Sequence, residues 1–445
     1  MMSHVDIAGQ ALDLAQRAAP EAEVAVGVAH TEQWLTRFAT SFIHQNVADD
    51  TTTVALTVHL DGRTAAASTT LTGADGLRDL VDRTLASAKL APADPSWPGL
   101  SSPAPLLSTG TLDEATAAAT PAQRAEVVKA FVDAAQGRET AGYCRTAHWL
   151  GAYANSAGQA VSGQATAADF DGIVRDRGAD SSTRLISTRL SDLDGAALGS
   201  QVARQVSGLA DAVELPAGEY EVVLLPAAVS DLLINFALAG FNGKQHAEKR
   251  SFVRLGEPQF DPAITLIDDA VSAGRVGVPY DSEGTPRMRL TLVENGVTTA
   301  LCHDRRSAVL SGAVSTGHSS GNAGFGPAAQ NLVLSAGDRT VEELIGSVRR
   351  GLLVTDFWYT RVLDPLRLTL TGLTRNGVWL IEDGHATTAV KNFRFTQAYP
   401  EALAPGRVLG VGSAAVAQPA RGGLGAWTGP ALHLAAWNFT GTASG

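Results

Sequence analysis

The chain has 445 residues, 45% of them hydrophobic, enough for two or three cores at about 150 residues per domain. Its net charge of −11 and pI near 5.4 argue against binding to phosphate backbones or anionic membranes. Two cysteines are too few for a secreted disulfide framework, and no apolar run reaches the ~18 residues of a membrane span. We therefore expect a cytoplasmic protein that binds neither nucleic acid nor membrane.

Residues 1–90 predict an N-terminal α+β module. An amphipathic helix pattern runs from Val5 to Ala19, and apolar residues then alternate with polar or small ones from Val54 to Leu60. The dipeptide Asp61-Gly62 follows, and both of these residue types accept positive φ. The alternation and the dipeptide together indicate a half-buried strand that ends in a tight hairpin turn.

A proline-rich linker and a second module come next. Five prolines lie between Pro92 and Pro105 and break any regular pattern, so residues 91–110 are predicted to be the linker. In residues 111–215 a helix is expected to begin with Thr120 as its N-cap and with proline in the first helical position. Strand patterns follow this helix, which indicates a second α+β module.

Residues 216–445 predict a large, mostly antiparallel, barrel-like β domain. Short β segments alternate with dipeptides that favour tight hairpins. These dipeptides are Asn295-Gly296, Asn376-Gly377 and Asp383-Gly384. One helix is expected to interrupt the strands from Thr340 to Leu353. The predicted fold class is therefore α+β, with N-terminal α/β modules followed by this C-terminal domain.

A strand and a helix near the start of the C-terminal domain are the most informative feature. Residues 220–225 form an apolar, β-branched run, and Pro226 is tolerated in the first turn of a helix. A helix is therefore predicted over residues 226–240. Zinc needs imidazole, thiolate or carboxylate donors, and between residues 222 and 243 only Asp231 offers one.

The chain resembles the TldE (PmbA) proteins, the partner subunits of the TldD/TldE metallopeptidases. The resemblance extends over nearly the whole chain and is sharpest in four strings. These are Thr355–Arg361, Thr371–Asp383, Asn392–Gln397 and Ala431–Thr440. It implies the TldD/PmbA fold for this chain and a TldD-like protein as its partner.

The resemblance also implies that this chain has lost a zinc site. In TldD proteins the equivalent helix carries His-Glu-x-x-x-His, in which the histidines bind zinc and the glutamate acts on the metal-bound water. Matching the strand and helix puts Ile234, Asn235 and Ala239 on those three positions. TldD proteins also supply a cysteine ligand near the C-terminus, whereas no cysteine follows Cys302 here. We expect no catalytic or metal-binding residue and no cofactor in this chain, with zinc in the TldD partner.

The leading functional hypothesis is a non-catalytic subunit of a heteromeric TldD/TldE zinc metallopeptidase that degrades or processes unfolded peptides. Two other hypotheses stay open. The chain could be an autonomous peptidase, metal-dependent or otherwise, whose site is assembled from distant residues. It could also be a regulatory binding protein of the gyrase-modulator type, although its acidic balance argues against direct contact with DNA.

Two segments are candidates for a cleft or an interface. The first is a polar loop after the predicted helix, for which a solvated linker is the alternative. The second is an aromatic and charged cluster, for which a buried structural cluster is the alternative. The candidate residues are Asn242, Lys244, His246 and Arg250 in the first segment, and Asp356, Trp358, Tyr359 and Arg361 in the second.

Two motif matches are better explained as turns. Gly317 to Gly321 fits the Gly-x-Ser-x-Gly pattern of a hydrolase nucleophile elbow, but the residues that follow cannot continue as a helix. Gly410 to Ala415 fits a dinucleotide fingerprint, but Pro419 cuts any helix short and no acidic residue follows Glu401. A serine nucleophile and NAD binding are therefore both disfavoured.

Overall fold

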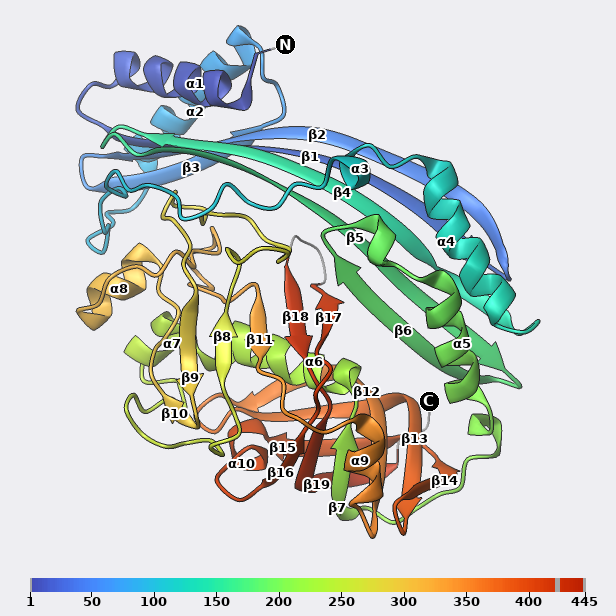
Figure 1. The fold of residues 1–445 in the computed structure, drawn as a ribbon. Helices are drawn as coiled ribbons and strands as arrows, with labels where there is room; N and C mark the ends of the chain where they lie inside the picture. The colour runs from blue at the N-terminus through green and yellow to red at the C-terminus, as the bar shows by residue number, and fades with distance from the viewer. Residues whose placement is uncertain (1, 421–424, 443–445) are drawn as a thin grey trace.

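Three β-sheets and the helices packed against them make up the protein (Figure 1). The computed structural model describes residues 2–420 and 425–442. In that part of the chain two sheets have six strands and the third has seven. The predicted α+β class, with a barrel-like C-terminal sheet, is confirmed.

The first sheet is antiparallel and has the strand order β3-β2-β1-β4-β5-β6. Its strands are β1 (Glu23–Ala39), β2 (Phe42–Leu60), β3 (Arg63–Thr69), β4 (Glu139–Asn155), β5 (Ala160–Asp176) and β6 (Ala179–Ser187). Strand β1 pairs with β4 over most of its length. Residues 1–90 and residues 111–215 therefore contribute to one continuous sheet.

The alternating pattern of β2 explains how the first sheet forms a core. Val54, Leu56 and Val58 are fully buried under the N-terminal helices, while Thr53 and Ala55 between and before them are more exposed. Asp61 and Gly62 then have φ values of 51° and 72° between β2 and β3. This is the two-residue hairpin turn that the sequence predicts.

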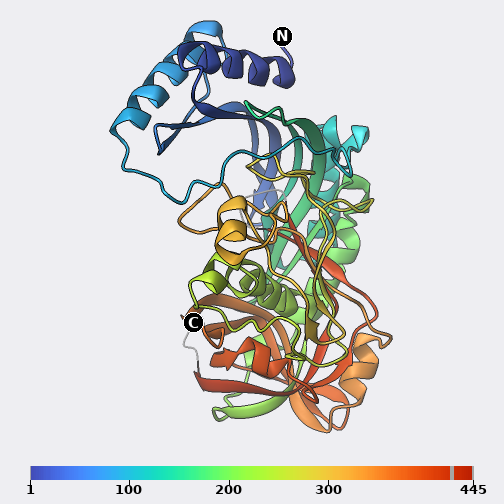
Figure 2. The same ribbon diagram turned by 90° about the vertical axis from the view of Figure 1, so that its left-hand side faces the viewer.

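Helices cover the two ends of the first sheet (Figures 1 and 2). They are α1 (His4–Ala18) and α2 (Ala74–Leu90) at one end, and α4 (Pro121–Ala134) and α5 (Gly195–Val206) at the other, while α3 (Glu114–Ala117) lies against β4 and β5 between them. Helix α4 begins as predicted, because the Thr120 hydroxyl accepts from the backbone N–H of Gln123 in a capping box. Each group of helices packs on its own cluster of buried apolar residues.

The second sheet is built from short strands in the order β10-β9-β8-β11-β18-β17. Their bounds are β8 (Leu266–Asp268), β9 (Leu290–Glu294), β10 (Val297–Thr298), β11 (Leu332–Leu334), β17 (Val416–Pro419) and β18 (Ala426–Gly429). Asn295 and Gly296 form the predicted tight turn between β9 and β10, with φ values of 47° and 85°.

The third sheet closes into a ring, because β12 pairs with both β7 and β13. The ring runs β12-β7-β19-β15-β13, while β14 extends β13 and β16 pairs with β19. The bounds are β7 (Gly218–Leu224), β12 (Arg350–Asp364), β13 (Thr369–Glu382), β14 (His385–Val390), β15 (Phe393–Ala398), β16 (Val408–Val411) and β19 (Leu432–Thr442). Its pairings are antiparallel except for β7 with β12.

Helix α6 (Pro226–Asn235) lies between the ring and the second sheet, as Figure 1 shows. Its apolar side chains, including Val229, Leu232 and Leu233, join the largest buried cluster of the protein. The remaining elements are the short helices η1 (Leu190–Asp192), η2 (Leu209–Asp211), η3 (Phe236–Gly240), α7 (Gly243–Ala247), α8 (Arg305–Ser311), α9 (Val341–Gly346) and α10 (Tyr399–Ala402). In the described residues, we find no helix both long and apolar enough to span a membrane.

Two predictions about the C-terminal domain are wrong in detail. The helix expected from Thr340 to Leu353 is only Val341–Gly346, because β12 begins at Arg350 and pairs with β7 and β13. Asn376 and Gly377 have positive φ as expected, but they lie inside β13, where the register with β12 shifts. They form a bulge instead of a hairpin turn, since the β13 chain continues past them.

The proline-rich segment is held against the C-terminal domain. The guanidinium of Arg306 donates to both carboxylate oxygens of Asp94, at 2.8 and 2.9 Å. Arg305 Nε donates to the carbonyl of Gly99 at 3.1 Å, and the Ser101 hydroxyl donates to the carbonyl of Glu283 at 2.6 Å. The segment is therefore irregular in its backbone but fixed in position.

Candidate functional site

Helix α6 widens at its C-terminal end. Helix α6 continues into η3, a π-helical turn, in which Phe241 N–H donates to the carbonyl of Phe236 at 3.0 Å. A π-turn holds more residues than an α-turn, so it brings positions five apart closer to one face of the helix. Positions 234 and 239 are five apart. The backbone thus suits a pair of ligands here, but the side chains are isoleucine and alanine.

Asp231, Asn235, Thr360 and Tyr399 form a closed set of hydrogen bonds beside this turn, which we call the Asp231 network. The hydroxyls of Thr360 and Tyr399 each donate to one carboxylate oxygen of Asp231, both at 2.9 Å. Asn235 Nδ2 donates to the backbone carbonyl of Asp231 at 2.8 Å. Burial and the Asp231 carboxylate raise the pKa of Tyr399 well above its usual value, so Tyr399 remains a neutral donor.

The residues at this position do not fit a zinc ion. Ile234 and Ala239 have no donor atoms and pack against the large apolar cluster. Both carboxylate oxygens of Asp231 already accept hydrogen bonds. Across residues 2–420 and 425–442, no group of three histidine, cysteine or acidic side chains is arranged to hold a metal. That the chain binds no zinc stays a prediction.

The first candidate segment is largely tied to a neighbouring loop. Asn242 is fully buried and caps α7, and its Nδ2 donates to the carbonyls of Phe325 and Pro327, at 3.1 and 2.8 Å. Lys244 Nζ donates to carbonyls in the same loop, at residues 323 and 324. These two side chains fix α7 against that loop.

The other two residues of this segment are less enclosed. His246 is half-buried on α7. Arg250 is exposed and lies 3.4 Å from the carboxylate of Glu248. The structure therefore does not bring the four candidates of this segment together around one hollow. Their assignment to a cleft or interface stays a prediction.

The second candidate segment joins the first sheet to the ring. Arg184 on β6 donates to Oδ2 of Asp356 on β12 at 2.7 Å, and Asn376 Nδ2 on β13 donates to the same oxygen at 3.0 Å. Burial raises the pKa of Asp356, while the guanidinium of Arg184 opposes the rise. This geometry favours the structural alternative for Asp356. Sequence reasoning missed Arg184, because the sequence of β6 does not indicate that β12 lies opposite it.

Each of the two aromatic rings of the second segment is in contact with the guanidinium of an arginine. The guanidinium of Arg361 lies 4.2 Å from the ring centre of Tyr359, and that of Arg375 lies 4.7 Å from the ring centre of Trp358. Tyr359 has φ of 57° and is 62% exposed, at a point where β12 shifts register against β13. The left-handed backbone conformation costs a tyrosine about 1–3 kcal/mol and persists only where the surrounding structure imposes it.

Within the described residues, no base is hydrogen-bonded to the serine of the Gly-x-Ser-x-Gly match. The hydroxyl of Ser319 lies 2.9 Å from the hydroxyl of Ser282, and its backbone N–H donates to Asp281. The neighbouring His318 instead bonds through Nε2 to Asp268, at 2.9 Å. A serine nucleophile needs a hydrogen-bonded base, so this arrangement does not form a catalytic triad.

Cys302, His318 and Asp268 come together from distant parts of the chain, and sequence reasoning did not find them. Burial alone would lower the pKa of His318, but its contacts with Cys302 and Asp268 raise it to about 10. All three side chains are sealed from solvent, with at most 1% exposed. Asp268 also accepts from two backbone N–H groups of residues 330 and 331. Their burial makes them a structural unit, because substrate cannot reach them.

Comparison with known proteins places the chain among the metallopeptidases. A family model described as the PmbA/TldA metallopeptidase C-terminal domain matches residues 217–441. A metalloprotease of Methanothermobacter thermautotrophicus is 29% identical over 166 residues, which is 35% of either chain. The metalloprotease TldD homolog of Buchnera aphidicola is 27% identical over 142 residues, 31% of this chain and 29% of that protein. The matched part thus covers about a third of each relative's length.

Solved structures share the whole fold. TldE from Thermococcus kodakarensis superposes with a TM-score of 0.87 at 18% identity, over 98% of this chain and 100% of that one. A candidate modulator of a DNA gyrase from Thermotoga maritima superposes with a TM-score of 0.84 at 17% identity, over the same shares. At these identities the likeness establishes the three-sheet architecture of the chain.

Proposed function

The chain belongs to the PmbA/TldD metallopeptidase family, and we propose that within this family it is a TldE-like, non-catalytic subunit. Its partner is a TldD-like protein that holds the zinc, and the assembly is a cytoplasmic peptidase that degrades or processes unfolded peptides. When bound in the partner, zinc supplies an activated water and polarises the scissile carbonyl. The residues of this chain stabilise the assembly and position the peptide.

The Asp231 network is the observation that carries this proposal. The π-helical turn at η3 keeps a backbone suited to ligands five residues apart, but the network beside it satisfies its own polar groups. Ile234 and Ala239 add apolar packing in place of ligands. This helix end has internal hydrogen bonds and apolar packing where TldD proteins have zinc ligands. That difference supports a structural role for the helix end in this chain.

The tip of the β12–β13 hairpin is the surface on which we expect the partner. Tyr359, Leu363 and Leu366 are 62%, 58% and 56% exposed, and Arg361 stacks on the first of them. Exposed aromatic and aliphatic side chains with an arginine are typical of interface anchors. The substitution Leu363→Asp should abolish co-elution with the TldD-like subunit while changing the melting temperature of the single chain little. Retained co-elution would move the interface elsewhere.

The test of the function compares the chain alone with the chain mixed with its TldD-like partner. Bound zinc and cleavage of an unfolded peptide are measured in both preparations. We expect both zinc and cleavage in the mixture and neither in the single chain. Stoichiometric zinc and chelator-sensitive cleavage by the single chain would instead establish an autonomous peptidase. A mixture that neither associates nor cleaves would contradict the proposal.

A further inference from the structure

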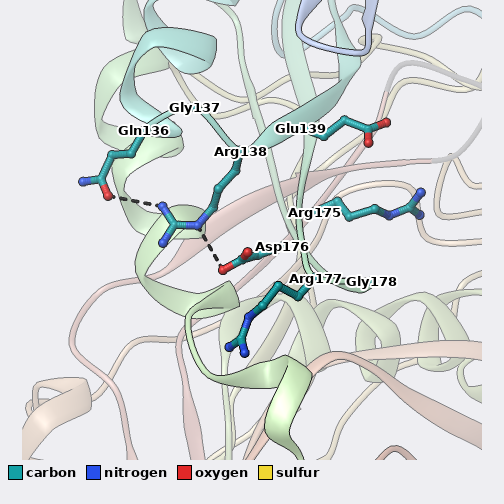
Figure 3. A pocket seen from close by; sticks show the side chains of 8 residues that line it. All are labelled: Gln136, Gly137, Arg138, Glu139, Arg175, Asp176, Arg177 and Gly178. Atoms are coloured by element: carbon teal, nitrogen blue, oxygen red, sulfur yellow. Dashed lines mark hydrogen bonds and ion pairs between the residues drawn. The ribbon is translucent and has the colours of Figure 1, made fainter.

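Two hollows adjoin the turn between β5 and β6, and they differ in how their charges are paired. The first has a volume of about 610 Å³ and is lined by Arg138, Arg175 and Arg177 among others (Figure 3). Each of these arginines has a carboxylate partner: Asp176 at 3.4 Å, Asp180 at 2.7 Å and Asp211 at 2.9 Å, respectively. Positive charge in this hollow is already neutralised, so it offers little to an anionic ligand.

The second hollow is larger, about 820 Å³, and lies where the first sheet meets the ring. Its walls come from the β5–β6 turn, η2, β12, β13 and the connection between β14 and β15. We call it the Arg375 groove. The lining residues that matter here are Arg177, Trp358, Arg375, Lys391 and Asn392. Its volume is within the range of small-ligand sites.

Arg375 brings an uncommitted positive charge to this groove. Its side chain contacts the ring of Trp358, and within the described part of the chain its guanidinium takes part in no ion pair or hydrogen bond. The guanidinium carbon lies 4.7 Å from the ring centre of Trp358, and the N–H groups of a guanidinium are the fork that binds a carboxylate with two parallel hydrogen bonds. Lys391 adds a second cation, whose partner Glu214 is 3.9 Å away and 61% exposed.

Asn392 contributes a hydrogen-bond donor of fixed orientation. The Thr374 hydroxyl accepts from the backbone N–H of Phe393 at 2.8 Å, so its own proton is free to donate to Oδ1 of Asn392 at 3.1 Å. This bond assigns Oδ1 as the acceptor, so Nδ2 is the donor that Asn392 brings to the lining of the groove. The groove therefore offers two cations and an amide N–H, a set that complements a carboxylate next to a peptide carbonyl.

We infer that the Arg375 groove binds the carboxylate of a peptide, with Arg375 as its anchor. The inference rests on the proposed function, because an assembly that processes peptides presents such carboxylates as substrate or product. A single uncommitted arginine in a chain of net charge −11 suits a singly charged group better than a phosphate backbone. The carboxylate can come from the C-terminus of the peptide or from an Asp or Glu side chain.

Binding of three fluorescent tetrapeptides to the single chain tests this and separates the two sources. One peptide ends in a free acid, the second is its amide, and the third is an amide with one internal glutamate. We expect the free acid to bind at least about tenfold more tightly than the plain amide, because charge-assisted hydrogen bonds are lost in the amide. Tight binding of the glutamate peptide alone would assign the groove to acidic side chains.

Variants of the chain locate the effect. Arg375→Gln should weaken binding of the acidic peptide about tenfold, and Arg375→Lys should restore part of it, since lysine keeps the charge without the fork. Arg350→Gln is the matched control, because Arg350 is an exposed arginine on the same strand as Trp358 and pairs with Glu382. Higher salt should weaken binding to the wild type more than binding to Arg375→Gln.

Equal binding of all three peptides, no binding of any, or unchanged affinity in Arg375→Gln would overturn the inference. The comparison of peptides on the wild-type chain decides the matter even where a variant does not fold. These outcomes are independent of the test of the proposed function. If the mixture cleaves peptides but the single chain shows no preference for a carboxylate, the subunit proposal holds and the groove inference is wrong. If the single chain binds the carboxylate but no mixture cleaves peptides, the groove inference holds and the subunit proposal is wrong.

Discussion

The Asp231 network and the Arg375 groove are both polar sites in the C-terminal domain, and they treat their polar groups in opposite ways. In the network, each carboxylate oxygen of Asp231 accepts a hydrogen bond from a hydroxyl, that of Thr360 or that of Tyr399. In the groove, Arg375 has an aromatic ring beneath it and no carboxylate partner in the part of the chain that the structure describes. The first site is closed and the second is open.

This difference separates stability from binding. A buried polar group that is satisfied internally contributes to folding, and removing its partner leaves a desolvated atom without a hydrogen bond. A charged group that lines a hollow and has no ion-pair partner within the chain can still form hydrogen bonds and an ion pair with a ligand. Mutations in the closed site should therefore change the free energy of unfolding, and those in the open site should change the affinity for a ligand.

Breaking the closed site should have the largest effect on stability. Asp231→Ala leaves the hydroxyls of Thr360 and Tyr399 without an acceptor, and Tyr399 is fully buried. We expect a loss of about 3 kcal/mol in the free energy of unfolding, measured by urea denaturation. In a Tyr399→Phe background the same substitution should cost at least 1 kcal/mol less, on the order of one lost hydrogen bond. Strict additivity of the two substitutions would show that the network is not closed.

Of the closed site, only the absence of zinc ligands was predictable from the sequence, and the hydrogen-bond network was not. The absence of ligands at positions 234, 235 and 239 follows from residue types and family resemblance. Thr360 and Tyr399 lie 129 and 168 residues from Asp231, and only the closure of the ring brings them to α6. Periodicity reports the face of one element and contains nothing about which element lies opposite.

The fold itself was more predictable, because its signals are local. Alternation in β2, the Thr120 cap of α4 and the Asp61-Gly62 turn each depend on a few neighbouring residues. The same local reasoning failed at Asn376-Gly377, where positive φ was expected correctly but serves a bulge inside β13. Positive φ fixes the backbone of two residues, and long-range pairing decides whether the chain turns there.

Glu283 is an intermediate case, because its side chain is half-buried and accepts the backbone N–H of Arg305 at 3.0 Å. Burial first, and then the neighbouring Asp281, raises the pKa of Glu283 from 4.5 to about 7. Its contribution to stability is therefore fully present below about pH 4.5 and is lost as the pH rises through 7. We expect the wild type to lose about 2 kcal/mol between pH 5 and pH 8 relative to Glu283→Gln, from the size of the shift. Parallel urea titrations of the two proteins would measure the difference, and identical pH profiles would contradict it.

Restoring ligands to the closed site tests whether its backbone still suits a metal. The triple variant Ile234→His, Asn235→Glu, Ala239→His restores the two histidine ligands and the glutamate of His-Glu-x-x-x-His across the π-helical turn, but it lacks the cysteine ligand of TldD proteins. We expect the variant to bind zinc that is present in excess, more weakly than a site with three protein ligands, at a stability cost of about 1 kcal/mol for the lost Asn235 hydrogen bond. Asn235→Glu alone is the control and should stay at background. No binding even with zinc in excess would mean that the turn does not bring the two introduced histidines to one face of the helix.

The open site should respond least in stability. Arg375→Gln removes a stacked cation that is worth about 0.5 kcal/mol at a partly exposed site, because the guanidinium has no buried partner to leave behind. Urea denaturation should therefore barely distinguish the variant from the wild type, although its affinity for a peptide carboxylate falls. A stability loss as large as that of Asp231→Ala would show that Arg375 is part of the packing between the two sheets. In that case the hollow around it would be a gap in the interface, and a change in affinity would no longer identify Arg375 as an anchor.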